Sequence, residues 1–240
     1  CLVFLVQIPL VILYAKGASP VHPIVVMLPL VGVLNFKVEK NGLWGIGLDS
    51  VNLCYTAWLT LAYGILSAMG WLIALRLEGM VLNVPPLSIQ LVWETIRSFA
   101  VGVFIVALWE EVVNRGYIQT RLQSAWGFWG AVVTTLLFAA MHIPSAIIDN
   151  DGDLLSVSFR CLKTSLAGFA FGYVYWRSGS VVTTIAMHGL NNALAGALLM
   201  FSGMSCQRLF RSQLTFQLPW LIGQISVTLG LCHLFFKDRE

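Results

Sequence analysis

The chain has 240 residues, of which 58% are hydrophobic and only 10% are charged, and its formal net charge is +3. Soluble globular domains carry about 25% charged residues, so this composition excludes that class and indicates an integral membrane protein. A segment that faces lipid must satisfy its own backbone hydrogen bonds, which favours an all-α fold. The basic residues are spread along the chain without a basic run, so nucleic acid is not expected as a partner.

Apolar runs divide the chain into membrane segments. A helix that crosses the hydrocarbon core needs about 20 mostly apolar residues. This length predicts a polytopic bundle of about eight transmembrane helices in one membrane domain of residues 1–240, with spans at 1–15, 19–36, 51–75, within 88–122, 126–143, 160–176, 180–203 and 215–236. Residues 37–49, short and rich in Gly, are expected to form a re-entrant or interfacial piece.

Two local features refine this division. Pro144 follows an apolar run and is expected to end its helix and to open a polar loop. The chain begins at Cys1, inside an apolar run and without Met, so further residues are expected upstream.

The stretch EEVVNR, residues 110–115, places three ionisable groups at or near the end of a predicted span. Such groups are costly within a membrane and usually face a protein interior or a water-filled cavity. Glu111 and Arg115 are four residues apart, so they share a helix face and can form an ion pair. Glu110 is rotated about 100° from Glu111 around the helix, so it lies outside this ion pair and can serve a different function. The alternative is that all three are interfacial charges that cap the span.

Two later stretches, FAAMH (138–142) and HGLNN (188–192), add imidazoles and amides. Taken alone, a histidine near a span end, such as His142, is more often a hydrogen-bonded structural residue. His188 and Asn192 share one face of an otherwise apolar helix, where both need partners, while Asn191 is expected to pack. If the three helices converge, a carboxylate near a neutral imidazole can deprotonate a water, and further donors can stabilise an oxyanion.

The three stretches fit the motifs EExxxR, FxxxH and HxxxN, in this order on separate helices. They resemble the CAAX protease and bacteriocin-processing family, also called Abi or type II CAAX proteases. The resemblance covers about residues 90–203, the expected catalytic-motif core. It implies an intramembrane glutamic endopeptidase without a cofactor, whose partners are the lipid bilayer and a membrane-associated peptide or protein tail. The expected location is the plasma (inner) membrane of a prokaryote.

The resemblance also implies roles for single residues. Glu110 would activate the water together with His142. His188 and Asn192 would form the oxyanion site. Glu111 and Arg115 would support the helix and its charge.

Several alternatives remain beside this interpretation. A site-2-type zinc protease needs HExxH, but neither His142 nor His188 is followed by Glu, and no rhomboid-type Ser or presenilin-type Asp pair is present. Zinc could still bind Glu110, His142 and His188 with one open position. In a different class, the chain could be a non-proteolytic scaffold or an assembly subunit that binds a membrane-complex partner. A transporter is disfavoured because no inverted repeat or matched broken helices are visible.

Overall fold

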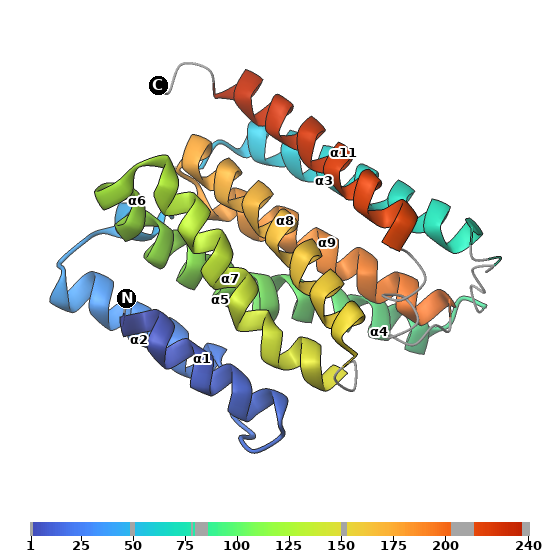
Figure 1. Ribbon diagram of the computed structural model, residues 1–240, viewed down its shortest axis with the longest axis horizontal. Coiled ribbons are helices and arrows are strands. Elements are labelled where there is room, and N and C mark those ends of the chain that lie inside the picture. Colours follow the sequence, from blue (N-terminus) through green and yellow to red (C-terminus); the bar gives the residue numbers. More distant parts are fainter. Residues whose placement is uncertain are drawn as a thin grey trace.

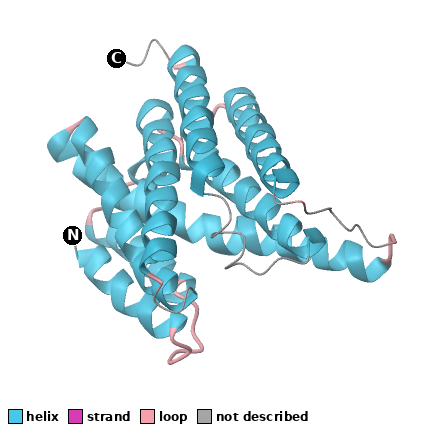
Figure 2. Cartoon of the chain, turned by 45° about the vertical axis from the view of Figure 1, so that its right-hand side comes forward, coloured by secondary structure: helices cyan, strands magenta, loops and turns pink. Residues whose placement is uncertain are grey.

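The computed structural model describes residues 2–48, 51–77, 79, 86–149, 153–202 and 214–236, and its regular elements are helices (Figures 1 and 2). They are, in chain order, α1 Leu2–Ala15, α2 Ile24–Gly32, η1 Val33–Val38, η2 Leu43–Ile46, α3 Leu53–Leu77, α4 Ile89–Ala100, η3 Val101–Ala107, α5 Leu108–Glu111, η4 Val112–Gln119, α6 Thr120–Trp126, α7 Phe128–Asp149, α8 Leu154–Ser178, α9 Val181–Ser202 and α11 Leu214–Phe235. The predicted all-α class is confirmed.

Within the described residues, five helices are long and apolar enough to cross a membrane, and two shorter apolar helices lie at 3–15 and 24–38. Helix α9 contains 22 residues and carries the HGLNN stretch. The chain is therefore a polytopic helical membrane protein; the sequence predicted about eight spans, and the described residues contain five long ones and two shorter apolar helices.

The helices pack side by side in an order that differs from their order in the chain (Figure 1). The α1 and α2 pair lies at one side and contacts α7 and η4, whereas α3 and α11 lie together at the other side against α9 and α8. Helices α5 and α7 to α9 occupy the middle. The three motif stretches are thus all on central helices.

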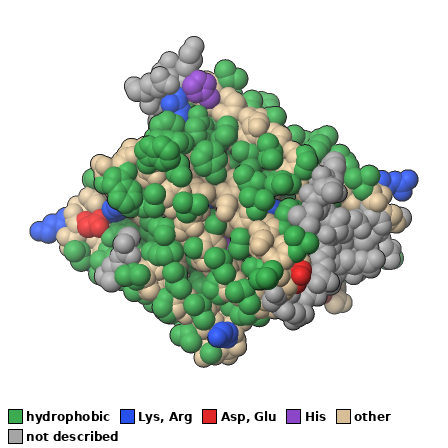
Figure 3. All heavy atoms as spheres, viewed as in Figure 1, with side chains coloured by type: hydrophobic (Ala, Val, Ile, Leu, Met, Phe, Trp, Pro, Cys, Tyr) green, Lys and Arg blue, Asp and Glu red, His purple; other side chains and the backbone are tan. Residues whose placement is uncertain are grey.

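The surface is apolar, as a lipid-facing surface should be. Hydrophobic side chains cover most of the face shown in Figure 3, and acidic and basic side chains are few there. Large exposed side chains such as Trp58, Phe104 and Trp129 contribute to this surface. In water a patch of this size would promote association, but in a bilayer it faces hydrocarbon.

The first motif lies within one continuous helix, Ile89–Trp126, formed by α4, η3, α5, η4 and α6. Its 38 residues extend for about 57 Å, nearly twice the roughly 30 Å hydrocarbon thickness. The conformation changes twice from α to π, at η3 and at η4. The four-residue segment α5, which contains Glu110 and Glu111, lies between these two π segments, and such irregular turns often occur at functional sites.

The prediction that Pro144 ends its helix is wrong. Helix α7 continues through Pro144 to Asp149, and α8 begins at Leu154, earlier than the predicted 160. Membrane helices tolerate an internal proline because packed neighbours offset the lost backbone bond, and α7 packs along α8. An ion pair between Asp149 and Arg160 joins the two helices near this end.

The segment between α2 and α3 is anchored to the long helix by polar contacts. Arg121 donates hydrogen bonds to Glu39 and to Asn35 Oδ1, the latter at 2.7 Å, and the Tyr117 hydroxyl donates to Glu39 Oε1 at 2.6 Å. Partial burial opposes ionisation of Glu39, but the hydrogen bonds from Arg121 and Tyr117 outweigh it and lower its pKa. Residues 37 and 38 continue the helical η1 rather than starting a separate piece.

Candidate active site

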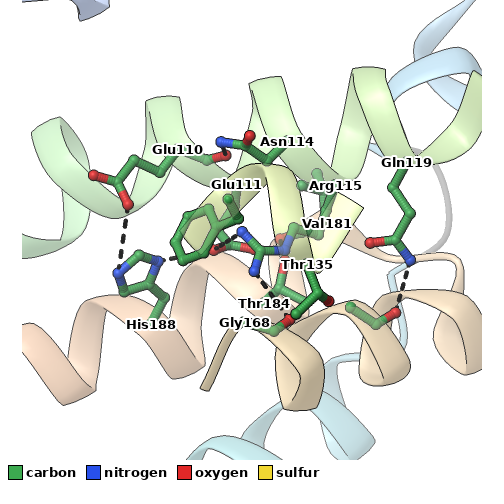
Figure 4. Close-up of polar contacts among 12 residues, drawn as sticks. Glu110, Glu111, Asn114, Arg115, Gln119, Thr135, Gly168, Val181, Thr184 and His188 are labelled. Carbon is green, nitrogen blue, oxygen red and sulfur yellow. Dashed lines mark hydrogen bonds and ion pairs between the residues drawn. The ribbon is translucent and has the colours of Figure 1, made fainter. Parts of the chain in front are cut away.

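The candidate site is built around two adjacent carboxylates on α5. Glu110 is 7% exposed and Glu111 is fully buried. Their side chains leave the helix in different directions, as Figure 4 shows. The Asn114 amide donates to the Glu110 carbonyl at 2.8 Å. The two acids are therefore presented to different partners.

Glu111 faces Arg115, which is one helical turn further along. Arg115 Nη1 lies 3.1 Å from Glu111 Oε1, and Arg115 is itself only 1% exposed. Its Nη2 donates to the Gly168 carbonyl of α8 at 3.1 Å, and its guanidinium carbon lies 4.0 Å from the centre of the Phe138 ring. The i,i+4 ion pair expected from the sequence is thus present, and it is fully buried between three helices.

Gly168 allows this close approach. A Cβ atom at this position would lie 3.0 Å from Phe138 Cδ1 and 3.4 Å from Arg115 Nη2. One turn later, the Gln119 amide donates to the Gly172 carbonyl at 2.7 Å. Small residues let membrane helices approach closely enough for such hydrogen bonds, so these contacts hold η4 against α8.

His188 connects the second carboxylate to the first. Its Nδ1 lies 2.8 Å from Glu111 Oε1, and its Nε2 lies 3.9 Å from Glu110 Oε2. The imidazole also stacks on the Phe171 ring of α8, with ring centres 5.2 Å apart. Because a carboxylate only accepts hydrogen bonds, Nδ1 must carry the proton in this contact. The hydrogen bond to Glu111 also fixes the orientation of the ring.

His142 approaches Glu110 from α7. Its Nδ1 lies 2.8 Å from the Phe138 carbonyl, which is also only an acceptor, so Nδ1 carries the proton. In the neutral imidazole, Nε2 then carries the lone pair. This atom lies 3.7 Å from Glu110 Oε2. Both histidines therefore direct Nε2 toward the same carboxylate oxygen.

Glu110 Oε2 has no hydrogen-bond partner within the described residues, although it is buried. Its distances to the two Nε2 atoms, 3.7 and 3.9 Å, are too long for direct hydrogen bonds. They are short enough for one water molecule to contact the carboxylate and an imidazole together. The geometry is that of a water-binding position between a carboxylate and two imidazoles.

A cavity of about 340 Å³ opens onto this position. Glu110, His142 and His188 line it, as do Asn191 and Asn192 of α9. Asn191, which was expected to pack, lines the cavity, and its Oδ1 accepts a hydrogen bond from Ser67 at 3.2 Å. The sequence interpretation also missed Phe171 and Gly168, since nothing in the three motifs refers to α8.

The geometry bears on the zinc alternative as well. Within the described part of the chain, no group of three or more His, Cys, Asp and Glu side chains has an arrangement that could hold a metal ion. His142 and His188 each use Nδ1 in a hydrogen bond and offer only Nε2 to the cavity.

Comparison with known families gives one result. Residues 92–194 match the model described as Rce1-like, type II CAAX prenyl endopeptidase Rce1-like. This region resembles the Rce1-like family. The resemblance seen in the three motifs is thereby confirmed, and the Rce1-like region contains all of them. Neither the curated proteins nor the solved structures gave a match.

Proposed function

We propose that this chain is an intramembrane endopeptidase that hydrolyses a peptide bond of a membrane-associated peptide or protein tail. The observation that carries the proposal is the position of Glu110 Oε2 between His142 Nε2 and His188 Nε2 in a cavity. A family of type II CAAX endopeptidases supplies the same reaction class. The site is buried among central helices of a polytopic membrane protein, so the substrate would reach it from the bilayer or its interface.

In the proposed mechanism, the attacking water donates one hydrogen bond to the Glu110 carboxylate and one to the lone pair on His142 Nε2. Both groups are bases, and together they draw a proton from the water as its oxygen attacks the scissile carbonyl carbon. The proton then passes to the amide nitrogen as the C–N bond breaks. The hydrogen bond from His142 to the Phe138 carbonyl supports this role, because it leaves Nε2 as an acceptor.

Side chains of α9 would stabilise the developing oxyanion. His188 in its protonated form can donate from Nε2 while Nδ1 stays bound to the Glu111 carboxylate. The Asn192 amide lines the same cavity one turn away and is the second proposed donor. Glu111 and Arg115 touch no substrate in this mechanism, and they position His188.

The test is cleavage of a peptide library by the purified protein in detergent. Glu110→Gln keeps the size of the side chain but cannot act as a base, so we expect a loss of roughly 100- to 10,000-fold with an unchanged unfolding midpoint. Glu94→Gln is the matched control, because it removes one carboxylate from α4, outside the cavity. This control should retain full activity.

Two outcomes would overturn the proposal. Loss of wild-type cleavage with a chelator, restored by zinc, would move the chemistry to a metal bound by Glu110, His142 and His188. Absence of cleavage by wild type, together with copurification of the same membrane partner by wild type and Glu110→Gln, would favour the non-proteolytic scaffold.

A further inference from the structure

One wall of the cavity carries a network of hydrogen bonds that the proposed mechanism does not use. Gln224 of α11 donates from Nε2 to Ser67 Oγ of α3 at 2.6 Å and to the Tyr63 carbonyl at 3.3 Å. Ser67 Oγ in turn donates to Asn191 Oδ1 of α9 at 3.2 Å. All four residues line the cavity, and Gln224 and Ser67 are only 6% and 4% exposed. The network therefore joins three helices at the cavity wall.

The direction of these hydrogen bonds follows from the chemistry of the groups. A backbone carbonyl only accepts, so the Gln224 atom beside the Tyr63 carbonyl is the amide nitrogen. Both hydrogens of this nitrogen are used, one by Tyr63 and one by Ser67. Ser67 accepts from Gln224 and has one proton of its own, which goes to Asn191. The Asn191 atom in this contact is therefore its amide oxygen.

Two atoms of this network are left for a ligand. Among the residues that the structure describes, Gln224 Oε1 accepts no hydrogen bond and Asn191 Nδ2 donates none. Both side chains line the cavity. A polar atom without a partner is costly on a side chain as buried as Gln224. A ligand that offers one N–H group and one C=O group therefore fits this wall.

We propose that Gln224 and Asn191 bind the backbone of one residue of the substrate peptide. Gln224 Oε1 would accept from the N–H of that residue, and Asn191 Nδ2 would donate to its C=O. In an extended chain these two groups of one residue point to the same side, which is how a neighbouring β-strand binds both. The inference rests on the proposed peptidase function, and it adds a subsite that holds the substrate extended without contacting its side chains.

The position of Asn191 on α9 indicates which substrate residue is bound. Asn191 follows His188 by three residues, which is about 4.5 Å along the helix. His188 Nε2 lies 3.9 Å from Glu110 Oε2, so the scissile bond of the proposed mechanism lies beside His188. An extended peptide rises about 3.3 Å per residue. The bound residue is therefore one or two positions from the bond that is cut.

Ester substitution in the substrate tests the hydrogen bond to Gln224. A set of peptides takes the best-cleaved sequence of the library and replaces one backbone N–H at a time by oxygen, at each bond except the scissile one. In wild type, we expect one ester within two positions of the cut to lower kcat/KM by about three- to tenfold, the range for a neutral hydrogen bond. Gln224→Met keeps the length of the side chain and removes the acceptor. It should lower kcat/KM for the all-amide peptide by a similar factor and leave that ester peptide unchanged.

A second variant tests the hydrogen bond from Asn191. Asn191→Leu removes the donor to the substrate C=O, which is present in the amide and ester peptides alike. It should lower kcat/KM for both peptides by about three- to tenfold and retain the effect of the ester. Gln90→Leu is the control, because Gln90 is exposed on α4 and lies outside the cavity. Its cleavage of both peptides should equal that of wild type.

Binding of the peptides to the Glu110→Gln protein, followed by fluorescence anisotropy, tests recognition without cleavage. The amide peptide should bind about three- to tenfold more tightly than the ester peptide, and Gln224→Met in the same background should abolish the difference. If wild type cleaves nothing, the tightest-binding peptide of the library takes the place of the best-cleaved one. That failure would count against the proposed function alone.

Three results would overturn the inference. If no ester changes kcat/KM or binding, no backbone N–H is bound at this wall. If Gln224→Met lowers cleavage of the amide and ester peptides equally, the network has a structural role and only joins α3, α9 and α11. If Asn191→Leu leaves kcat/KM unchanged, its amide does not bind the substrate.

Discussion

The buried pair of Glu111 and Arg115 allows a quantitative prediction. Replacing Arg115 with Met removes a charge that is 1% exposed, together with its hydrogen bonds to Glu111 and Gly168. Glu111 then remains fully buried without its cation. Breaking a buried ion pair in this way costs about 3–5 kcal/mol. We expect Arg115→Met to lower the free energy of unfolding by that amount, because Glu111 is fully buried and loses the guanidinium that balances its charge.

The double variant with Glu111→Gln and Arg115→Met supplies the comparison. It removes both charges, and the Gln amide oxygen can still accept a hydrogen bond from His188 Nδ1. Replacing both members of a buried pair is often close to neutral, so the double variant should be at least about 2 kcal/mol more stable than Arg115→Met alone.

Denaturant-dependent tryptophan fluorescence in mixed micelles would measure all three stabilities, with Arg76→Met, at the exposed end of α3, as the control. Equal stability of Arg115→Met and the double variant would refute the reasoning, because it would mean that a buried Glu111 carboxylate without Arg115 costs nothing.

Two other predictions concern packing and pH. Gly168→Ala should lower the free energy of unfolding by about 1–3 kcal/mol, since its Cβ would lie 3.0 Å from Phe138 Cδ1; thermal unfolding should show no such loss for Gly223→Ala, where a Cβ meets nothing within 4 Å. The hydrogen bonds to Glu39 make its pKa lower in the folded protein than the value of about 4.3 in the unfolded chain. Their contribution to the free energy of unfolding is complete above the unfolded-state pKa and is lost as the pH falls through the folded-state pKa. The difference in unfolding midpoint between wild type and Glu39→Gln should therefore be constant above about pH 5.5 and shrink toward pH 3, and a difference that grows on acidification would contradict this assignment.

The sequence predicted the helices well because hydropathy depends on local composition. Apolar runs indicated each long helix of the described residues, and the i,i+4 spacing indicated the ion pair between Glu111 and Arg115. The end of α7 was predicted wrongly because the prediction considered only the backbone hydrogen bond that Pro144 removes from the helix. Packing of α7 against α8 outweighs that cost, and packing between distant segments is not visible in a single run of residues.

The lining of the cavity was predicted less well, for two different reasons. Asn191 could have been found, because a residue three positions after His188 lies on nearly the same helix face as one four positions after it. Phe171 could not, since its place against His188 depends on how α8 crosses α9. Lys163, which also lines the cavity, could not be found either, because the sequence around it contains none of the three motifs.

The charge of the buried cluster explains why the motif contains two acids rather than one. With both imidazoles neutral, before His188 gains the proton that it needs as an oxyanion donor, Glu110, Glu111 and Arg115 sum to one negative charge. The Arg115 guanidinium is paired with Glu111, with Nη1 3.1 Å from Oε1. The remaining negative charge therefore resides on Glu110, the carboxylate that faces the cavity. A single acid beside Arg115 would be neutralised and held away from the water. The second acid therefore separates two tasks, because Glu111 holds Arg115 and orients His188 while Glu110 remains an unpaired base. Glu110→Gln should accordingly abolish cleavage without loss of fold.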